Sequence, residues 1–167
     1  MNRVTVNSTP IIGLSIVGQL TLLSELFDEV YVPEAVYQEI VHNRAPRHYG
    51  KGELKRLVSE GVFRLYKVKN YNIVKSLYGK FHAGELEVII GAKELGAQVV
   101  VMDEHAARSL SKQFLLRPIG TIGILILGKK NGKITEVKPL LDTLLENGFY
   151  LSRRLYQEAL LLAEETL

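Results

Sequence analysis

The chain has 167 residues, of which 47% are hydrophobic and 23% are charged, and its formal net charge is +3. This length and composition exclude a disordered chain and predict a single ordered domain with a full hydrophobic core. Because the chain has no cysteine and no apolar stretch of membrane-spanning length, a disulfide framework, a thiolate metal site and a transmembrane protein are excluded, and we expect a cytoplasmic protein without a signal peptide.

Short apolar runs alternate with helical patterns along the chain, which is typical of a parallel sheet covered by helices. In chain order, we predict a strand at 3–6, helices at 10–18 and 20–27, a strand at 29–32, a helix at 34–42, helical turns within 53–59, a strand at 62–68, and helices at 71–78 and 84–94. We then predict the central buried strand at 98–102, a helix at 104–113 and a strand at 116–119. A turn at 120–123 leads into a helix that ends at Lys129, and two further helices are predicted at 136–146 and 152–165.

Several helix ends carry specific signals. Pro10 suits the first residue of a helix, with Ser8 or Thr9 as its cap. Gly96 suits a helix C-terminus, and Ser152 suits the cap of the last helix.

Two apolar runs end on polar residues that open helices. The first is followed by Asn7, and the second by Asp103 and Glu104. Ligands collect at the carboxyl ends of parallel strands, and Glu85 at a helix start and Glu39 near a helix end can reach the same edge. Oxygen donors of this kind suit a hard cation such as Mg²⁺ or Mn²⁺, which would activate water and neutralise charge on a phosphate.

Each acid also has a purely structural interpretation. Glu85 and Glu104 can stabilise the first turn of a helix, and Glu39 can be a solvated surface residue. The joint placement of these acids, and not any one of them, is what points to a metal site.

The positive charge is concentrated in residues 44–80, which carry a net charge of +8 against −5 for the remainder of the chain. Tyr49, Tyr66, Tyr71 and Tyr78 lie among or close to these charges. Basic residues interleaved with aromatic ones favour contacts with phosphates and stacking on bases. The alternative is an ordinary solvated surface.

Five motifs occur in a fixed order along the chain: Asn7-Ser8-Thr9-Pro10, Val32-Pro33-x-x-Val36-x-x-Glu39, Gly84-Glu85-x-Glu87, Val101-Met102-Asp103-Glu104-x-x-Ala107-Arg108 and Gly120-Thr121-Ile122-Gly123. In this order they resemble the motifs of the PIN-domain proteins, specifically a prokaryotic branch with a C-terminal extension related to ribonuclease toxins. The resemblance implies a three-layer α/β/α fold with a central parallel sheet of about four or five strands plus C-terminal helices. It also implies a nuclease domain at 1–130, a helical extension at 131–167 packed on it, a homodimer, and RNA cleavage with Mg²⁺ or Mn²⁺.

Carried over by position, Glu39, Glu85 and Asp103 match the family's acidic residues, and Glu104 matches a frequent additional acid. Thr121 matches a nearby polar position of the family. Ser8 or Thr9 matches the hydroxyl residue that usually follows the family's first Asp. Asn7 is the departure, because that place is normally Asp. An amide oxygen ligates a hard cation without bringing a charge, so we expect weaker metal binding and a lower rate.

The first hypothesis is a metal-dependent endoribonuclease of the PIN type, with a toxin–antitoxin role that would make an antitoxin protein a partner. Asn7, Glu39, Glu85, Asp103 and Glu104 would bind the ion, with Glu39, Glu85 and Asp103 catalytic. The residues assigned to RNA contact are Ser8, Thr9, Arg44, Arg47, Lys51, Lys55, Arg56, Arg108 and Thr121.

Two other hypotheses stay open. One is a PIN-like RNA-binding or partner-binding module whose catalysis was lost with Asn7. The other is a nucleotide-binding switch or transferase, but the sequence contains no phosphate-binding loop. His82 is either an ordinary surface histidine or a contact to metal or phosphate. The apolar C-terminal helix around Leu160 either packs in the core or forms a dimer seam.

Overall fold

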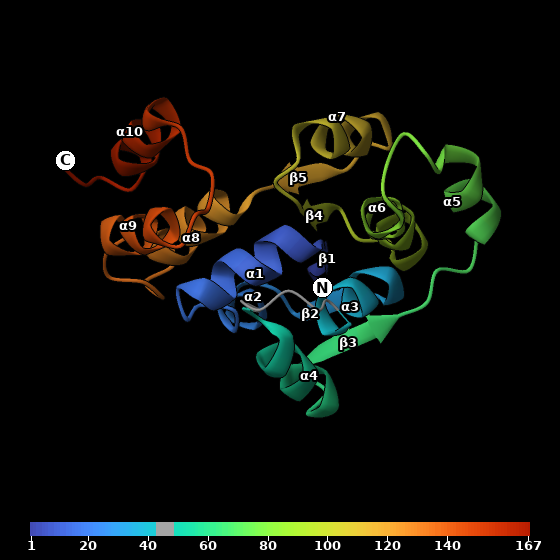
Figure 1. Ribbon diagram of the computed structural model, residues 1–167. Coiled ribbons are helices and arrows are strands. Elements are labelled where there is room, and N and C mark those ends of the chain that lie inside the picture. The colour runs from blue at the N-terminus through green and yellow to red at the C-terminus, as the bar shows by residue number, and fades with distance from the viewer. Residues whose placement is uncertain (43–48) are drawn as a thin grey trace.

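The computed structural model describes residues 1–42 and 49–167 (Figure 1), so the RNA contacts predicted for Arg44 and Arg47 lie outside the described residues. The sheet is parallel and has the strand order β3-β2-β1-β4-β5. Its strands are β1 (Arg3–Val6), β2 (Glu29–Pro33), β3 (Phe63–Tyr66), β4 (Val99–Val101) and β5 (Arg117–Ile119). The three-layer α/β/α fold expected from the sequence is confirmed.

The helices lie close to the ranges predicted from hydrophobic periodicity. They are α1 (Ser8–Ile16), α2 (Leu22–Leu26), α3 (Glu34–Val41), α4 (Lys51–Ser59), α5 (Tyr71–Leu77), α6 (Ala83–Leu95), α7 (His105–Gln113), α8 (Thr121–Lys130), α9 (Lys138–Glu146) and α10 (Arg153–Leu162). In the described part of the chain, no helix is both long and apolar enough to cross a membrane.

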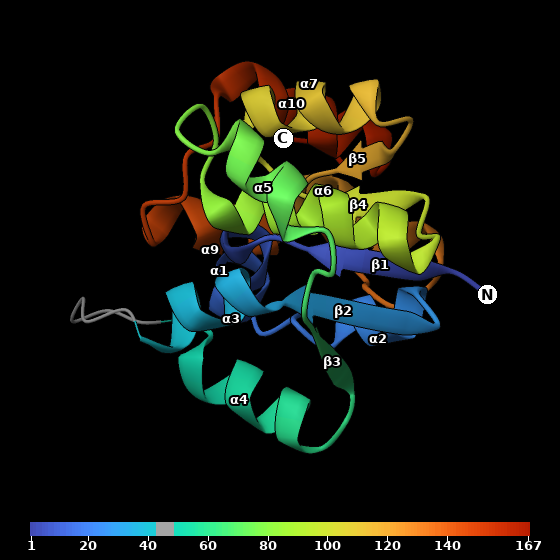
Figure 2. The ribbon, with the colours of Figure 1, turned by 90° about the vertical axis from the view of Figure 1, so that its right-hand side faces the viewer.

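The helices cover the sheet on both faces. In Figure 1, α1, α2 and α8 lie on one side of the strands, and α6 and α7 lie on the other. The C-terminal helices α9 and α10 lie outside α8, and Figure 2 shows the strands between these layers from a second direction. The strands β1, β2 and β4 are therefore shielded from water on both faces, as in most parallel sheets, whereas the edge strand β3 exposes Arg64 and Leu65.

The central strands are runs of apolar residues, without alternating polar ones, because they lie in the core. Val4, Val6, Val32 and Val101 are fully buried. The same apolar cluster contains residues of the C-terminal helices, among them Leu144 and Leu160. The two final helices therefore bury apolar surface in the main core, which is a favourable term in their folding.

Two details of the sequence prediction were wrong. The central strand is β1, not residues 98–102, because the chain adds β2 and β3 on one side of β1 and then crosses to β4 and β5 on the other. The N-cap of α1 is Asn7, whose Oδ1 accepts a hydrogen bond from Ser8 N at 2.9 Å, so neither Ser8 nor Thr9 caps this helix. The predicted ends at Gly96 (φ 68°) and Ser152, which accepts from Leu155 N, are confirmed.

The crossing between β1 and β4 places their carboxyl ends side by side. Asn7 N donates to Val101 O at 2.9 Å, two residues before Asp103. The chain leaves these neighbouring strands in opposite directions, which is the arrangement that opens a crevice for ligands in parallel sheets. Asn7 and Asp103 both lie at this edge.

One carboxylate near the C-terminus adds polar contacts to the apolar packing of α10. Glu165 accepts hydrogen bonds from Val137 N (2.6 Å), Lys138 N (2.8 Å) and Lys129 Nζ (2.6 Å). Burial raises the pKa of Glu165, but these three donors outweigh it and hold the pKa below its usual range. The carboxylate thus satisfies free N–H groups at the start of α9.

Replacing Glu165 by Ala is expected to lower the free energy of unfolding by about 1–3 kcal/mol, because the half-buried donors lose their acceptor. Urea unfolding followed by circular dichroism measures this loss. The matched control is Glu158→Ala, which removes an exposed partner of Arg154 and is expected to cost less than about 0.5 kcal/mol. Equal losses in the two variants would contradict the anchoring role.

Candidate functional site

The first half of the candidate site is formed where α1, α3 and α6 meet. Asn7 at the end of β1 has a relative exposure of 5%, and the carboxylate of Glu39 in α3 accepts a hydrogen bond from Ser8 Oγ at 3.2 Å through Oε1. A β-carbon at position 84 would lie 3.2 Å from Glu39 Oε2 and 3.6 Å from Asn7 Oδ1. The glycine therefore leaves space in front of one amide oxygen and one carboxylate oxygen.

A cavity of about 300 Å³ opens at this point. It is lined by Ala35 and Glu39 of α3 and by His82, Ala83 and Gly84 at the start of α6. The N-terminus of a helix carries unpaired N–H groups and a partial positive charge. The cavity thus combines the carboxylate of Glu39 with a helix start that tolerates negative charge on a ligand.

The second half of the site is formed around Asp103, which follows β4. Asp103 Oδ1 accepts from Thr121 N at 2.8 Å and Oδ2 accepts from Thr121 Oγ1 at 2.7 Å, so the carboxylate caps α8. Burial raises the pKa of Asp103, opposed by the hydrogen bonds from Thr121 and by the charge of Arg108. The carboxylate is therefore held rigidly and poorly solvated.

Arg108 of α7 reaches back over the end of β4, where its Nη1 donates to Met102 O at 3.3 Å. A β-carbon at Gly120 would lie 2.8 Å from Asp103 Oδ1 and 2.9 Å from Arg108 Nη1. A side chain at position 120 would therefore force the Asp103 carboxylate or the end of the Arg108 side chain to move. The contact of Arg108 with a substrate phosphate stays a prediction.

The raised pKa of Asp103 predicts a specific pH dependence of stability. Because its folded pKa lies above the unfolded value of 3.8, its charged form is penalised at neutral pH, and its contribution becomes more favourable as the pH falls through the folded pKa. The difference in unfolding free energy between the chain and Asp103→Asn is expected to shrink from pH 7 towards pH 4, in urea titrations at each pH. A constant difference would contradict this.

The other two predicted acids, Glu85 and Glu104, lie at the starts of helices. Glu85 Oε2 accepts from His82 N at 3.1 Å, so this carboxylate closes the first turn of α6. Glu104 is the exposed N-cap residue of α7. Among the described residues, no three histidine, aspartate or glutamate side chains converge as a complete metal site would require. Glu85 and Glu104 as ligands stay predictions.

Glu87 belongs to the motif Gly84-Glu85-x-Glu87 but has no role predicted from the sequence, and its side chain is 6% exposed in α6. Burial and the charge of Glu34 raise its pKa, whereas the backbone N–H of Ala35 lowers it. Glu87 lies three residues after Gly84, hence on the same face of α6. Its place among the apolar residues Leu86 and Val88 was the signal that could have identified a buried acid.

Part of the predicted basic surface is already neutralised. Arg56 pairs with Glu60 at 3.4 Å, and Arg64 pairs with Glu29 at 2.7 Å. Tyr66 donates its hydroxyl to Glu94, which together with burial raises its pKa to about 12. Exposed residues that could still contact RNA include Lys55, Thr9, Tyr71 and Tyr78.

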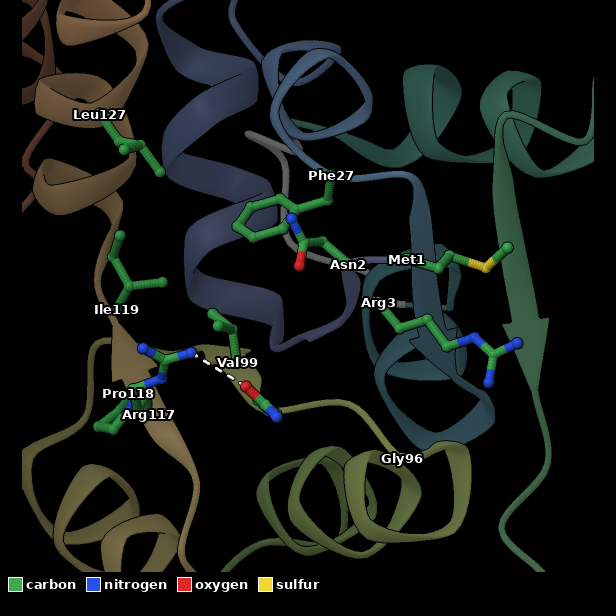
Figure 3. Close-up of a pocket in the computed structure, with 11 residues that line it drawn as sticks. Met1, Asn2, Arg3, Phe27, Gly96, Val99, Arg117, Pro118, Ile119 and Leu127 are labelled. Atoms are coloured by element: carbon green, nitrogen blue, oxygen red, sulfur yellow. Dashed lines mark hydrogen bonds between the residues drawn. The ribbon is translucent and has the colours of Figure 1, made fainter.

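A larger cavity of about 420 Å³ lies at the amino ends of β1, β4 and β5 (Figure 3). Arg117 donates to Gln98 Oε1 across its floor at 3.1 Å, and Phe27 and Leu127 form apolar walls. This cavity contains none of the predicted site residues. It lies at the opposite edge of the sheet from Asn7 and Asp103.

The donor chemistry of the first half suits a divalent cation. An amide oxygen, a carboxylate oxygen and the hydroxyl of Ser8 are hard ligands of the kind that Mg²⁺ and Mn²⁺ prefer. The space left by Gly84 lies in front of two of them. The donor types therefore suit the kind of metal that the resemblance implies, but Glu39 is the one carboxylate among these three donors.

Comparison with known proteins identifies the family of the chain. A family model described as a PIN domain matches residues 3–165, which is nearly the whole chain. A search of curated proteins found no match. PIN domains have a nuclease-type fold and generally depend on a divalent metal. By this match over nearly the whole chain and by its parallel three-layer fold, the chain belongs to the PIN-domain family.

Proposed function

We propose that the chain is an endoribonuclease of the PIN type that depends on Mg²⁺ or Mn²⁺. The observation that carries the proposal is the convergence of Asn7 Oδ1 and Glu39 Oε2 on the space beside Gly84, next to the end of β4. A bound ion would activate water and neutralise charge on the scissile phosphate.

The side chains around this space have separable tasks. Glu39 is oriented by Ser8, so that Oε1 accepts a hydrogen bond while Oε2 faces the cavity. Asp103 is fixed by Thr121, which suits a carboxylate that binds the ion or orients water. Arg108 and the lysines Lys51 and Lys55 would hold the RNA backbone.

The resemblance also supports two partners. We infer a toxin role with an antitoxin protein as inhibitor, and a homodimer. The exposed apolar residues of α10 support the dimer, because Leu155, Leu161 and Leu162 are 43%, 77% and 55% exposed. Light scattering on the full chain tests the dimer, and co-purification with the product of the adjacent gene tests the antitoxin.

The test of the nuclease is the cleavage of a mixed single-stranded RNA pool with Mg²⁺, with Mn²⁺ and with EDTA. We expect slow cleavage with either metal and none with EDTA. Absence of cleavage by a folded chain and by Asn7→Asp would count against the nuclease.

One observation favours a second function. Asn7 brings no charge to the site, which weakens both metal binding and the stabilisation of an attacking hydroxide. The second candidate is therefore an RNA-binding PIN module. RNA binding that is unaffected by metal, without cleavage, would favour it.

Replacing Asn7 by Asp is expected to raise the affinity for Mn²⁺ and the cleavage rate about tenfold, or about 1.4 kcal/mol, because a second carboxylate faces the ion. Asp is as good an N-cap as Asn, so α1 keeps its cap. Calorimetric titration and the cleavage assay measure the two effects. The control is Asn2→Asp, an exposed residue at the opposite edge of the sheet, for which neither quantity should change.

A further inference from the structure

The two outer edges of the sheet differ in their capacity to accept a further strand. The sheet ends at β3 on one side and at β5 on the other, and within residues 1–42 and 49–167 neither has a strand on its outer side (Figure 2). In an edge strand, every second residue directs its N–H and C=O groups away from the neighbouring strand. These groups can pair with an extended segment of another chain.

The outer edge of β5 is blocked by Pro118. Arg117 N donates to Gln98 O at 2.8 Å. Ile119 O accepts a hydrogen bond from Met102 N at 3.0 Å, so the main chain of β5 faces the β4 segment before and after Pro118. Pro118 therefore faces outward, and it has no N–H to donate. A proline at this position is one way in which proteins prevent the addition of a strand.

The outer edge of β3 has no such block. The strand contains no proline, and two aliphatic side chains beside its edge remain in water, since Val62 is 38% exposed and Leu65 is 43% exposed. In the neighbouring strand β2, by contrast, Val30 and Val32 are buried. An added strand would cover Val62 and Leu65, and burial of their apolar surface would favour its binding.

The charge along this edge indicates the chemistry of a partner. Residues 62–69 carry three basic side chains and no acidic one, namely Arg64, Lys67 and Lys69. Glu29 pairs with Arg64 at 2.7 Å and with Arg3 at 2.6 Å. Glu94 lies beside Lys69. Four cations against two acids leave the edge of β3 with a net charge of about +2, which attracts an acidic segment.

We propose that the outer edge of β3 binds an extended segment of a partner protein in which acidic and apolar residues alternate. Side chains alternate between the two faces of a strand, so Leu65 projects from one face of this edge and Arg64 from the other. Apolar residues of the added strand would cover Leu65, and its acidic residues would face Arg64.

Two other occupants fit this edge less well. A second copy of the chain would bring two basic edges together, and like charges on paired strands repel each other. RNA would gain nothing from the aliphatic side chains of Val62 and Leu65 or from the outward C=O groups, because phosphates are bound by donors and by positive charge.

The test is a fluorescence titration of the full chain with labelled synthetic peptides of equal length. The first peptide alternates valine and glutamate, and the second alternates valine and lysine. The third is the first with proline in place of its central valine, which keeps the charge but interrupts a strand. A mixed-sequence oligoribonucleotide is the remaining probe. Hydrogen exchange of the β3 backbone amides, measured by nuclear magnetic resonance, reports whether a peptide pairs with the main chain.

Two variants with matched controls locate the binding surface. Leu65→Ser and Lys67→Ala change exposed side chains at the edge of β3, and circular dichroism checks that both variants fold. Leu161→Ser in α10 and Lys112→Ala in α7 make the same changes at exposed residues of other elements.

We expect the valine–glutamate peptide to bind at least about tenfold more tightly than the other two peptides, and to slow hydrogen exchange in β3. Leu65→Ser and Lys67→Ala should each weaken its binding about threefold or more, while the two control variants bind like the parent chain. Equal binding of the proline peptide, or absence of peptide binding, would overturn the proposal. RNA binding that Lys67→Ala weakens, without peptide binding, would assign this edge to nucleic acid and overturn it as well.

Discussion

The variant Asp103→Asn is expected to lose RNA cleavage by about a hundredfold or more while folding as stably as the parent chain. Asp103 follows the end of β4 at the candidate site, and its carboxylate accepts two hydrogen bonds from Thr121. Loss of its charge removes transition-state stabilisation of about 3 kcal/mol, and each 1.36 kcal/mol is a tenfold change in rate.

The free energy of unfolding of Asp103→Asn should not fall together with its activity. Burial raises the pKa of Asp103, which means that the charged carboxylate is penalised in the fold. An isosteric amide removes that penalty and still accepts from Thr121 through its oxygen. The metal-free variant is therefore expected to unfold at the same or a higher urea concentration than the parent.

The matched control is Asp28→Asn. Asp28 is exposed before β2 and accepts a hydrogen bond from Asn2 N, which the amide oxygen can also accept. Cleavage and stability should both be unchanged. Wild-type cleavage by a folded Asp103→Asn would remove Asp103 from the catalytic site.

The variant Gly120→Ala is expected to damage both the fold and the site. Its backbone angles, φ −90° and ψ 174°, are open to alanine, so the cost is steric and not conformational. The added carbon would lie 2.8 Å from Asp103 Oδ1 and 2.9 Å from Arg108 Nη1. The overpacking is expected to cost about 1–3 kcal/mol.

Activity should fall further than stability alone would predict. The carboxylate and the guanidinium must separate to admit the methyl group, and a displacement of about 1 Å costs about a hundredfold in rate. Thermal unfolding and cleavage at a temperature where the variant is fully folded separate the two effects.

The control for this variant is Gly52→Ala. Gly52 is exposed in α4, and a β-carbon there would meet nothing within 4 Å. Alanine has a higher helix propensity than glycine, so this change is expected to be neutral or to stabilise by up to about 1 kcal/mol. If Gly120→Ala behaves like Gly52→Ala, the packing of Asp103 and Arg108 around position 120 is not tight.

The site residues illustrate which contacts a sequence can predict. Asn7 and Asp103 were placed at strand ends, and both lie there, because an apolar run followed by a polar helix start has few other interpretations. The role of Glu85 could not be settled in this way. The same carboxylate can bind a metal or cap its own helix, and in the structure it accepts a hydrogen bond from His82 N. Glu87 was missed because its burial depends on α3 packing against α6.

The sequence by itself determined the alternation of strands and helices, the C-terminal stop at Gly96, the cap at Ser152 and the polar residues that follow β1 and β4. These features depend on local chemistry and on the period of hydrophobic residues. Only the tertiary structure decided that β1 is central, that Gly84 leaves space in front of Asn7 and Glu39, and that Gly120 fits between Asp103 and Arg108. Those facts depend on the direction of the crossovers and on the packing of segments distant in the sequence, which no local pattern encodes.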